Sequence, residues 1–197
     1  MKAFTVRHTA LKLALALASA QGAWAGTTHV ALSGQFAPGL GVVGRFSAFE
    51  APLLNAAGQV AFQGSITGSG ITASNNSGVW SNSSLIARTG TAAPGAGSGA
   101  SFASFSGLQL NAAGQVAYEG KLVGSSVTAG NDTGIWRNNT LLVRTGHAAP
   151  GAGAGTTFSD FFGYQLNAAG QVAFGGMLTG PGVGASNRAG IWQGSTL

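Results

Sequence analysis

The sequence predicts an all-β protein of three 56-residue antiparallel repeats, each with four short strands packed like the blade of a propeller. Glycine accounts for 34 of the 197 residues and only 7% of residues are charged, which excludes a charged helical protein or a coiled coil. A nonapeptide recurs at a constant spacing, and beyond residue 25 no apolar period of 3.6 residues is sustained. A three-fold, trefoil-like closed barrel is the alternative architecture, because it also takes four strands from each of three units.

The N-terminus has the pattern of a secretory signal peptide over residues 1–25. Basic residues precede or enter an apolar run at 11–20, and the tripeptide AWA at 23–25 fits the small-residue cleavage pattern. The run is too short for a membrane span, and no transmembrane segment is expected in the mature chain. The sequence therefore predicts a bacterial protein that is secreted or held in the periplasm or at the cell surface, with residues 26–197 as a single repeat domain.

Charge in the predicted mature chain is low and scattered. Removing residues 1–25 removes three of the nine basic residues and none of the four acids, so six minus four leaves a formal charge of +2. Nucleic-acid binding is not expected, because it needs clustered Lys and Arg to neutralise phosphates. The lack of cysteine excludes disulfides, thiolate catalysis and cysteine-ligated zinc.

The repeat runs through the predicted mature chain without an insertion. LNAAGQVAF begins at Leu54 and Leu166, and LNAAGQVAY begins at Leu110, so the spacing is 56 residues both times. Further residues keep this spacing: Trp80, Trp136 and Trp192; Pro38, Pro94 and Pro150; Phe46, Phe102 and Phe158. The matches divide the chain into units 30–85, 86–141 and 142–197. Two interpretations stay open: the units are a fragment of a longer array, or the N-terminal segment VALSGQFAPG supplies a strand to the last unit.

The expected strands follow one order, illustrated by the second unit. The segment LIARTG (85–90) comes first, and a loop rich in Gly, Ala and Pro leads to a strand with an F-x-x-F pair. The tetrapeptide NAAG at 111–114 predicts a hairpin turn, in which Asn bonds its own backbone and Gly accepts a positive φ. We expect a bulge near Gly120 in the returning strand, then a polar loop and a last strand around Trp136.

The repeated motif, followed by G-[VI]-W and then by R-T-G-x-x-A-P-G, resembles a bacterial family of exported tandem-repeat proteins, the choice-of-anchor tandem repeat proteins with the NxxGxxAF motif. Asn55, Gly58, Ala61 and Phe62 match this motif, and the two later copies match it again, with Tyr118 in place of Phe. The resemblance covers residues 30–197. It implies a secreted or surface-attached array without a general enzymatic activity.

No catalytic constellation is predicted. A glycosidase would need two carboxylates across one cleft, but the acids occupy unrelated positions of the repeat. They are Glu50, Glu119, Asp132 and Asp160. His147 and Asp160 could be written into a Ser-His-Asp triad, yet no nucleophile elbow accompanies them. The glycine-rich loops 95–99 and 151–155 lack the Lys and the helix of a phosphate-binding loop, so we interpret them as connectors.

No metal or cofactor site is predicted either. The loop 131–134 offers oxygen ligands for calcium, but the third copy carries Arg188 where the second carries Asp132, which favours a turn. The few histidines and acids also make a zinc site unexpected. Arg88 and Arg144 recur beside a Gly turn, where we expect them to bond neighbouring carbonyl groups.

The tryptophans repeat beside apolar residues, so we interpret them as core, with a platform for sugar rings as the alternative. These observations favour a non-enzymatic exported β-repeat protein with a structural, adhesive or interaction role at the cell surface or in the matrix. Its expected partners are itself, missing repeats, or a surface glycan or protein. One alternative is a carbohydrate-binding module with up to three equivalent weak sites, which buried tryptophans would count against. A remote alternative is a secreted hydrolase with acids, or His147 and Asp160, converging in one pocket.

Overall fold

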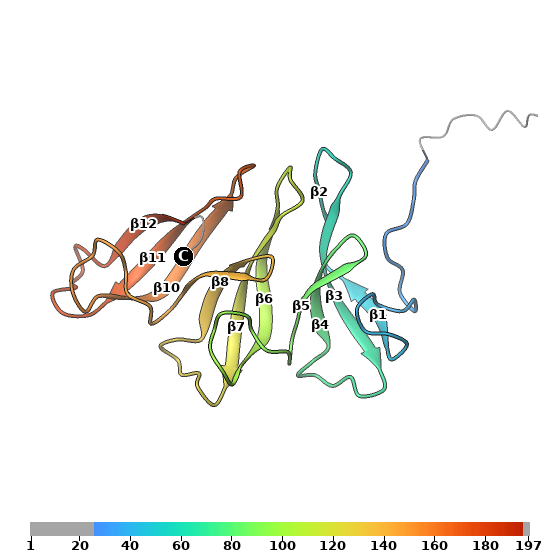
Figure 1. Ribbon diagram of the computed structural model, residues 1–197, viewed down its shortest axis with the longest axis horizontal. Helices are drawn as coiled ribbons and strands as arrows, with labels where there is room; N and C mark the ends of the chain where they lie inside the picture. Colours follow the sequence, from blue (N-terminus) through green and yellow to red (C-terminus); the bar gives the residue numbers. More distant parts are fainter. Residues whose placement is uncertain (1–25, 195–197) are drawn as a thin grey trace, which may run out of the picture.

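The computed structural model describes residues 26–194, which form three antiparallel β-sheets without a helix in the described part (Figure 1). The predicted signal peptide lies outside the described residues, as do residues 195–197. The first sheet contains β1 (Gly44–Phe49), β2 (Leu53–Leu54), β3 (Val60–Gly68), β4 (Ser77–Ser81) and β5 (Ser84–Arg88). The second contains β6 (Ala100–Leu110), β7 (Val116–Gly124), β8 (Thr133–Arg137) and β9 (Thr140–Arg144). The third contains β10 (Thr157–Leu166), β11 (Val172–Thr179) and β12 (Ala189–Gly194).

Each sheet is a meander in which the strands pair in chain order. β1 and β2 both pair with β3, and together they correspond to the single long strand β6 or β10 in the other sheets. Pro52 lies between β1 and β2, where its missing N–H fits a break in an edge strand. The repeat is therefore a blade-like antiparallel sheet, which confirms the predicted fold class.

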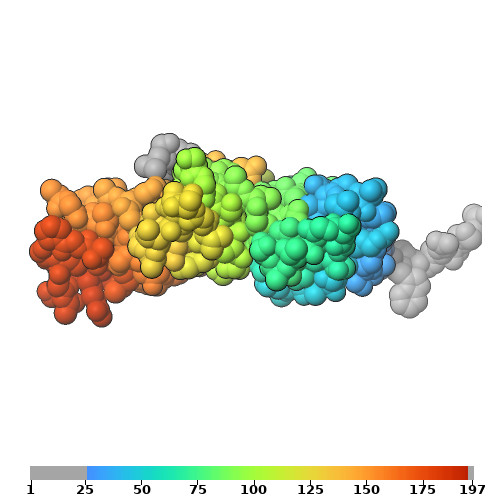
Figure 2. Space-filling model, turned by 90° about the horizontal axis from the view of Figure 1, so that it is seen from below, coloured from blue at the N-terminus to red at the C-terminus, as the bar shows by residue number. Residues whose placement is uncertain are grey.

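The three sheets lie face to face in an open row rather than around a common axis. Figure 1 shows the N-terminal and C-terminal sheets at opposite ends of the longest axis, and Figure 2 shows the same elongated shape from below. None of the sheets closes on itself, so the trefoil-like barrel is wrong. Within one chain the N-terminal segment does not complete the last unit, because it lies beside the first sheet, where Phe36 bridges to Arg45, at the end of the row opposite the third sheet (Figure 1).

The strand in LIARTG belongs to the sheet before it, not to the sheet after it. β5 pairs with β4 and β9 pairs with β8, so each of these strands closes its sheet as the last member. The sheets therefore begin after the predicted unit boundaries, at residues 44, 100 and 157. Sequence periodicity fixes the length of a repeat but not where a structural unit starts within it, because any phase of the period gives the same matches.

The NAAG turn forms as predicted. In the first unit Asn55 Oδ1 accepts hydrogen bonds from the main-chain N–H groups of Ala57 (3.0 Å) and Gln59 (2.9 Å), and Gly58 has a φ of 76°. The bulge expected near Gly120 lies instead in the neighbouring strand, where the register shifts between Phe102 and Ser104. Gly120 has a different role: a Cβ there would lie 2.9 Å from the rings of both Phe102 and Trp136.

Each unit is built around one tryptophan. The indole Nε1 groups of Trp80, Trp136 and Trp192 donate to the main-chain oxygens of Pro38, Pro94 and Pro150, at 3.1, 2.9 and 3.0 Å. A phenylalanine lies edge-on to each indole with ring centres 4.9 Å apart in all three pairs. Trp80 and Trp136 are fully buried, and Trp192 is half-buried. The prediction that the tryptophans are core residues is therefore confirmed for the first two.

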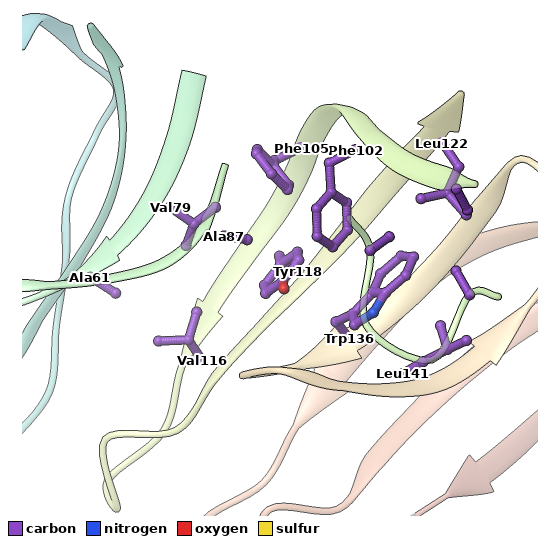
Figure 3. Close-up of a cluster of buried hydrophobic side chains, with 13 residues drawn as sticks. Ala61, Val79, Ala87, Phe102, Phe105, Val116, Tyr118, Leu122, Trp136 and Leu141 are labelled. Atoms are coloured by element: carbon purple, nitrogen blue, oxygen red, sulfur yellow. The ribbon is translucent and has the colours of Figure 1, made fainter. Parts of the chain in front are cut away.

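The two faces of each sheet differ, and this difference orders the row. One face, the aromatic face, carries the Trp together with Phe or Tyr, such as Phe102, Tyr118 and Trp136. The opposite, aliphatic face carries small and branched residues, as at Ala61, Val79 and Ala87. Figure 3 shows the aromatic face of the second sheet against the aliphatic face of the first, in one buried cluster. The second cluster repeats this arrangement between sheets two and three, with Ala117, Ile135 and Val143 as the aliphatic face.

Candidate functional site

The junctions between units gather the repeated polar side chains, and they form the candidate interaction site of this protein. At each junction an asparagine turn reaches across to the equivalent turn of the next unit. Asn55 Nδ2 donates to the main-chain oxygen of Asn111, and Asn111 Nδ2 donates to that of Asn167, both at 2.8 Å. The three asparagines therefore form a ladder whose spacing is the sequence repeat itself.

A glutamine two residues before the asparagine strengthens the second junction. Gln109 Nε2 donates to the main-chain oxygen of Tyr164 (2.5 Å), and its Oε1 accepts from the N–H of Leu166 (2.7 Å). In return the Tyr164 hydroxyl donates to the main-chain oxygens of Ser106 and Gly107. A Cβ on Gly107 would lie 2.7 Å from that hydroxyl, so the glycine makes room for the tyrosine.

The glutamine of the NAAGQ motif covers the turn of the following unit. A Cβ on Gly114 would lie 2.5 Å from Gln59 Oε1, and one on Gly170 would lie 2.4 Å from Gln115 Oε1. Gly58, in the first unit, has no atom within 4 Å of that position. Each internal turn is thus shaped to receive the unit before it, and the first turn is shaped in the same way with nothing on it among the described residues.

Two of the four acids come near each other at the second junction. Burial raises the pKa of Glu119, and the nearby Asp160 carboxylate raises it further, while the Ser106 hydroxyl that donates to Glu119 Oε1 (3.3 Å) lowers it. The Asp160 carboxylate accepts from the N–H of Phe161 (2.8 Å). Neither acid lines any of the described hollows. The sequence, which places these acids at unrelated repeat positions, did not predict this pair.

The remaining acid–base candidates are placed in separate surroundings. His147 lines a hollow of about 320 Å³ with apolar residues and Trp192, and burial lowers the pKa of the His147 ring. Neither a carboxylate nor a serine lines that hollow, so His147 and Asp160 do not meet there. Glu50 accepts from Gln63 Nε2 at 2.8 Å, beside the first sheet.

The loop that offered calcium ligands uses its oxygens to close a turn. Asn131 Oδ1 accepts from the N–H of Thr128 (2.7 Å), and Asn75 and Asn187 accept in the same way in their own loops. Asp132 forms an ion pair with Lys121 at 2.8 Å. In residues 26–194 no group of three or more His, Cys, Asp or Glu side chains is placed to hold a metal ion.

The recurring arginines bond main-chain carbonyl groups, as predicted. Arg88 Nε donates to the oxygen of Asn75 (2.7 Å), and Arg144 Nε donates to that of Asn131 (2.5 Å). Arg144 is 7% exposed, and its Nη1 also donates to the oxygen of Ala96 (2.6 Å). These bonds tie the polar loop and the glycine-rich connector to the last strand of the sheet. The connectors 95–99 and 151–155 are turns with positive-φ glycines rather than phosphate loops.

Sequence reasoning missed the side chains that hold the units together. Gln59 and Gln115 are visible in the nonapeptide, but a repeated Gln does not reveal that it packs on the glycine 55 residues later. Gln109 and Tyr164 have no equivalent pair at the first junction, so periodicity gave no signal for them. The partial signal was the strict spacing of Asn and Gly, which a hairpin turn alone does not require.

Comparison with known proteins identifies a family but no function. No curated protein and no solved structure matches the chain. In the described part, no helix is long and apolar enough to cross a membrane. A family model described as "Family of unknown function (DUF7453)" matches residues 13–197, which includes all three sheets. The chain therefore belongs to this family, DUF7453.

Proposed function

We propose that this chain is an exported, non-enzymatic repeat scaffold with a structural or interaction role at the cell surface or in the matrix. The observation that carries the proposal is the use made of the repeated side chains. Asn55 and Asn111 bond across junctions, and Trp80 and Trp136 are fully buried. The residues that recur in every unit make the contacts between units, which supports an architectural role. The loops, which differ between units, are then available for contacts with other molecules.

The same burial weakens the carbohydrate-binding alternative. A sugar platform needs an exposed aromatic face, whereas Trp80 and Trp136 are 0% exposed and their indole N–H groups are already bonded. Among the tryptophans of residues 26–194, only Trp192 has an exposed part. Retention of the chain on insoluble polysaccharides is therefore expected to be absent. Retention that is lost in Trp192→Ala would favour a binding module and contradict the scaffold.

The predicted export from the cytoplasm can be tested by cell fractionation. The full chain and a matched chain that starts at residue 26 are expressed in the same bacterium, and both are followed into cytoplasm, periplasm, surface and medium. We expect the full chain outside the cytoplasm with a mature N-terminus at residue 26, because residues 1–25 carry the charge and apolar pattern of a leader. The shorter chain should stay inside. Equal retention of both chains in the cytoplasm would overturn the proposal.

A further inference from the structure

The two ends of the row expose the faces that are buried inside it. On the aliphatic face of the third sheet Ile191 is 73% exposed, whereas its equivalents Val79 and Ile135 are 0% exposed. At the other end Leu54 is 71% exposed, whereas its equivalents Leu110 and Leu166 pack against the clusters at the two junctions. Terminal units of stable repeat arrays usually carry polar outer faces. Neither outer face has that character here.

Both outer faces are also hollowed where an incoming unit would pack. The aromatic end has a hollow of about 320 Å³ lined by Phe49, Pro52, Leu54 and Val60 among others. The aliphatic end has one of about 270 Å³, bordered by Phe162, Ala173 and Ile191. At the internal junctions the residues equivalent to Val60, namely Val116 and Val172, are 0% exposed, because the preceding unit covers them.

The second junction pairs a small residue with a large one, and the equivalent positions at the two ends of the row carry a large residue and a small one. At the second junction small Ser106 lies beside large Tyr164, whose hydroxyl reaches the main chain of Ser106. The equivalent of Ser106 on the third unit is Phe162, and the equivalent of Tyr164 on the first unit is Pro52. Phe162 is 48% exposed. In a head-to-tail contact the large Phe162 would therefore face the small Pro52, whereas at the second junction the small Ser106 faces the large Tyr164.

The polar groups of the junction are also in place at both ends. Asn167 Nδ2 bonds Gln171 Oε1 of its own turn at 2.8 Å, as its equivalents do, and it has a second N–H that could donate to the main-chain oxygen of an incoming Asn55. Gln165 is exposed at the position from which Gln109 bonds the next unit. Gln171 corresponds to Gln115, which packs over Gly170 at the second junction. The space over Gly58 is open and could receive Gln171 of another copy in the same way.

We infer that the third unit of one copy binds the first unit of a second copy, head to tail, by repeating the internal junction. Ile191, Ala173 and Phe162 would contact Leu54, Val60 and Pro52 of the second copy. The inference rests on the structural role proposed above, for which it names the partner. Because the two surfaces differ, the contact is heterologous and generates an open filament or a closed ring rather than a two-fold dimer.

The head-to-tail contact would also place a segment of the second copy beside the unpaired edge of β12. Within residues 26–194 β12 pairs only with β11, whereas β4 and β8 each have partners on both sides. Val30 and Ala31 of the second copy are equivalent to Ile86 and Ala87 in β5. The head-to-tail arrangement therefore brings that segment beside β12, where an added strand would satisfy the exposed edge.

Two blocked variants test the inference directly. In residues 26–197, which contain every described strand, Ile191→Lys places a charge on the aliphatic end and Leu54→Lys places one on the aromatic end. Sedimentation velocity should show a wild-type mass that rises with concentration and a monomer for each variant alone. An equimolar mixture of the two variants should give a one-to-one dimer, because each retains the end that the other has lost.

The control is Val42→Lys, which charges an apolar side chain that is 78% exposed in the loop before β1 and outside both faces. It should associate like the wild type. A monomeric wild type together with a monomeric mixture would overturn the inference, as would association of either blocked variant alone. If export is still observed in that case, only the head-to-tail contact fails and the scaffold role stands.

A size exchange gives a second, independent test. Pro52→Tyr alone should weaken association, because Phe162 leaves no room for the larger ring, and Phe162→Ser alone should weaken it by leaving a gap. The double variant re-creates the Ser–Tyr pair of the second junction and should recover most of the association. Additive losses in the double variant would contradict the assigned contact.

Discussion

The side-chain amide of Asn111 donates a 2.8 Å hydrogen bond to the main-chain oxygen of Asn167, the equivalent residue of the next unit. Asn111 Nδ2 also donates to Gln115 Oε1, and Asn111 Oδ1 accepts from the main-chain N–H of Gln115. One side chain therefore holds its own hairpin turn and the contact with the following unit. This dual use explains why the motif recurs in strict register along the chain.

Replacing Asn111 should cost more than replacing Asn167. Asn111→Ala loses its turn and the bond to the next unit, whereas Asn167→Ala loses a turn alone, since its amide bonds no later unit among the described residues. Asn111 Oδ1 also accepts from the N–H of Ala113, a bond without an equivalent at Asn167, so the difference in the free energy of unfolding should be about 1–3 kcal/mol, the net value of two hydrogen bonds. Urea unfolding of the two variants measures it, in chains that also carry Ile191→Lys so that no second copy bonds Asn167. Equal losses would show that the ladder contributes nothing.

Gly120→Ala should destabilise the central unit. The added methyl would lie 2.9 Å from the rings of Phe102 and Trp136, both fully packed in the core. Overpacking of this kind costs about 1–3 kcal/mol. Gly184→Ala is the matched control, because the nearest atom to its new Cβ is 4.0 Å away. Thermal unfolding should separate the two variants, and a Gly120 variant as stable as the control would contradict the packing described.

Turns and side-chain hydrogen bonds to the main chain were predictable where a particular residue type is required by the local backbone conformation. Asn at the start of the NAAG turn and Gly at its end follow from hydrogen bonding and positive φ, and the structure has both. Arg88 and Arg144, beside the Gly turns of two units, were also predicted to bond carbonyl groups, and both do so. Such assignments depend on neighbours within a few residues, which a sequence displays directly.

Relationships between units were not predictable in the same way. The sequence period does not indicate where a structural unit starts, and β5 pairs with β4 in the sheet that precedes it. The proximity of Glu119 and Asp160 arises because adjacent sheets stack face to face, and nothing in their sequence positions indicates it. Periodicity reports that units are equivalent but not how one unit packs on another.

Glu119 should make stability depend on pH. Burial and the nearby Asp160 raise its pKa above the ordinary value of 4.5, so the folded chain binds this proton more tightly than the unfolded chain does. Its contribution to stability is therefore complete below the unfolded pKa and is lost as the pH rises through the folded pKa. Glu119→Gln should gain stability relative to wild type as the pH rises from 4.5 through the raised pKa of the folded chain, as urea titrations at a series of pH values would show. A pH-independent difference would contradict the assigned surroundings.

Trp136→Phe should cost more than Trp192→Phe. The first substitution leaves the Pro94 oxygen without its indole donor inside a fully buried site, which costs about 1–3 kcal/mol in addition to the lost packing. The second affects a half-buried residue at the end of the row. Urea midpoints with unchanged slopes would report this order. The reverse order would indicate that the third unit, rather than the second, carries the stability of the row.

The open row itself is tested most directly by distances between equivalent loops. Ala73, Ala129 and Ala185 are exposed equivalents in the three units, and the chain has no cysteine, so pairs of introduced cysteines can carry spin labels. Labelled chains are diluted with unlabelled chain, so that only distances within one chain are read by pulsed electron paramagnetic resonance. The row predicts a distance from 73 to 185 clearly longer than the distances from 73 to 129 and from 129 to 185. Three equal distances would show a closed three-fold ring and contradict the arrangement described.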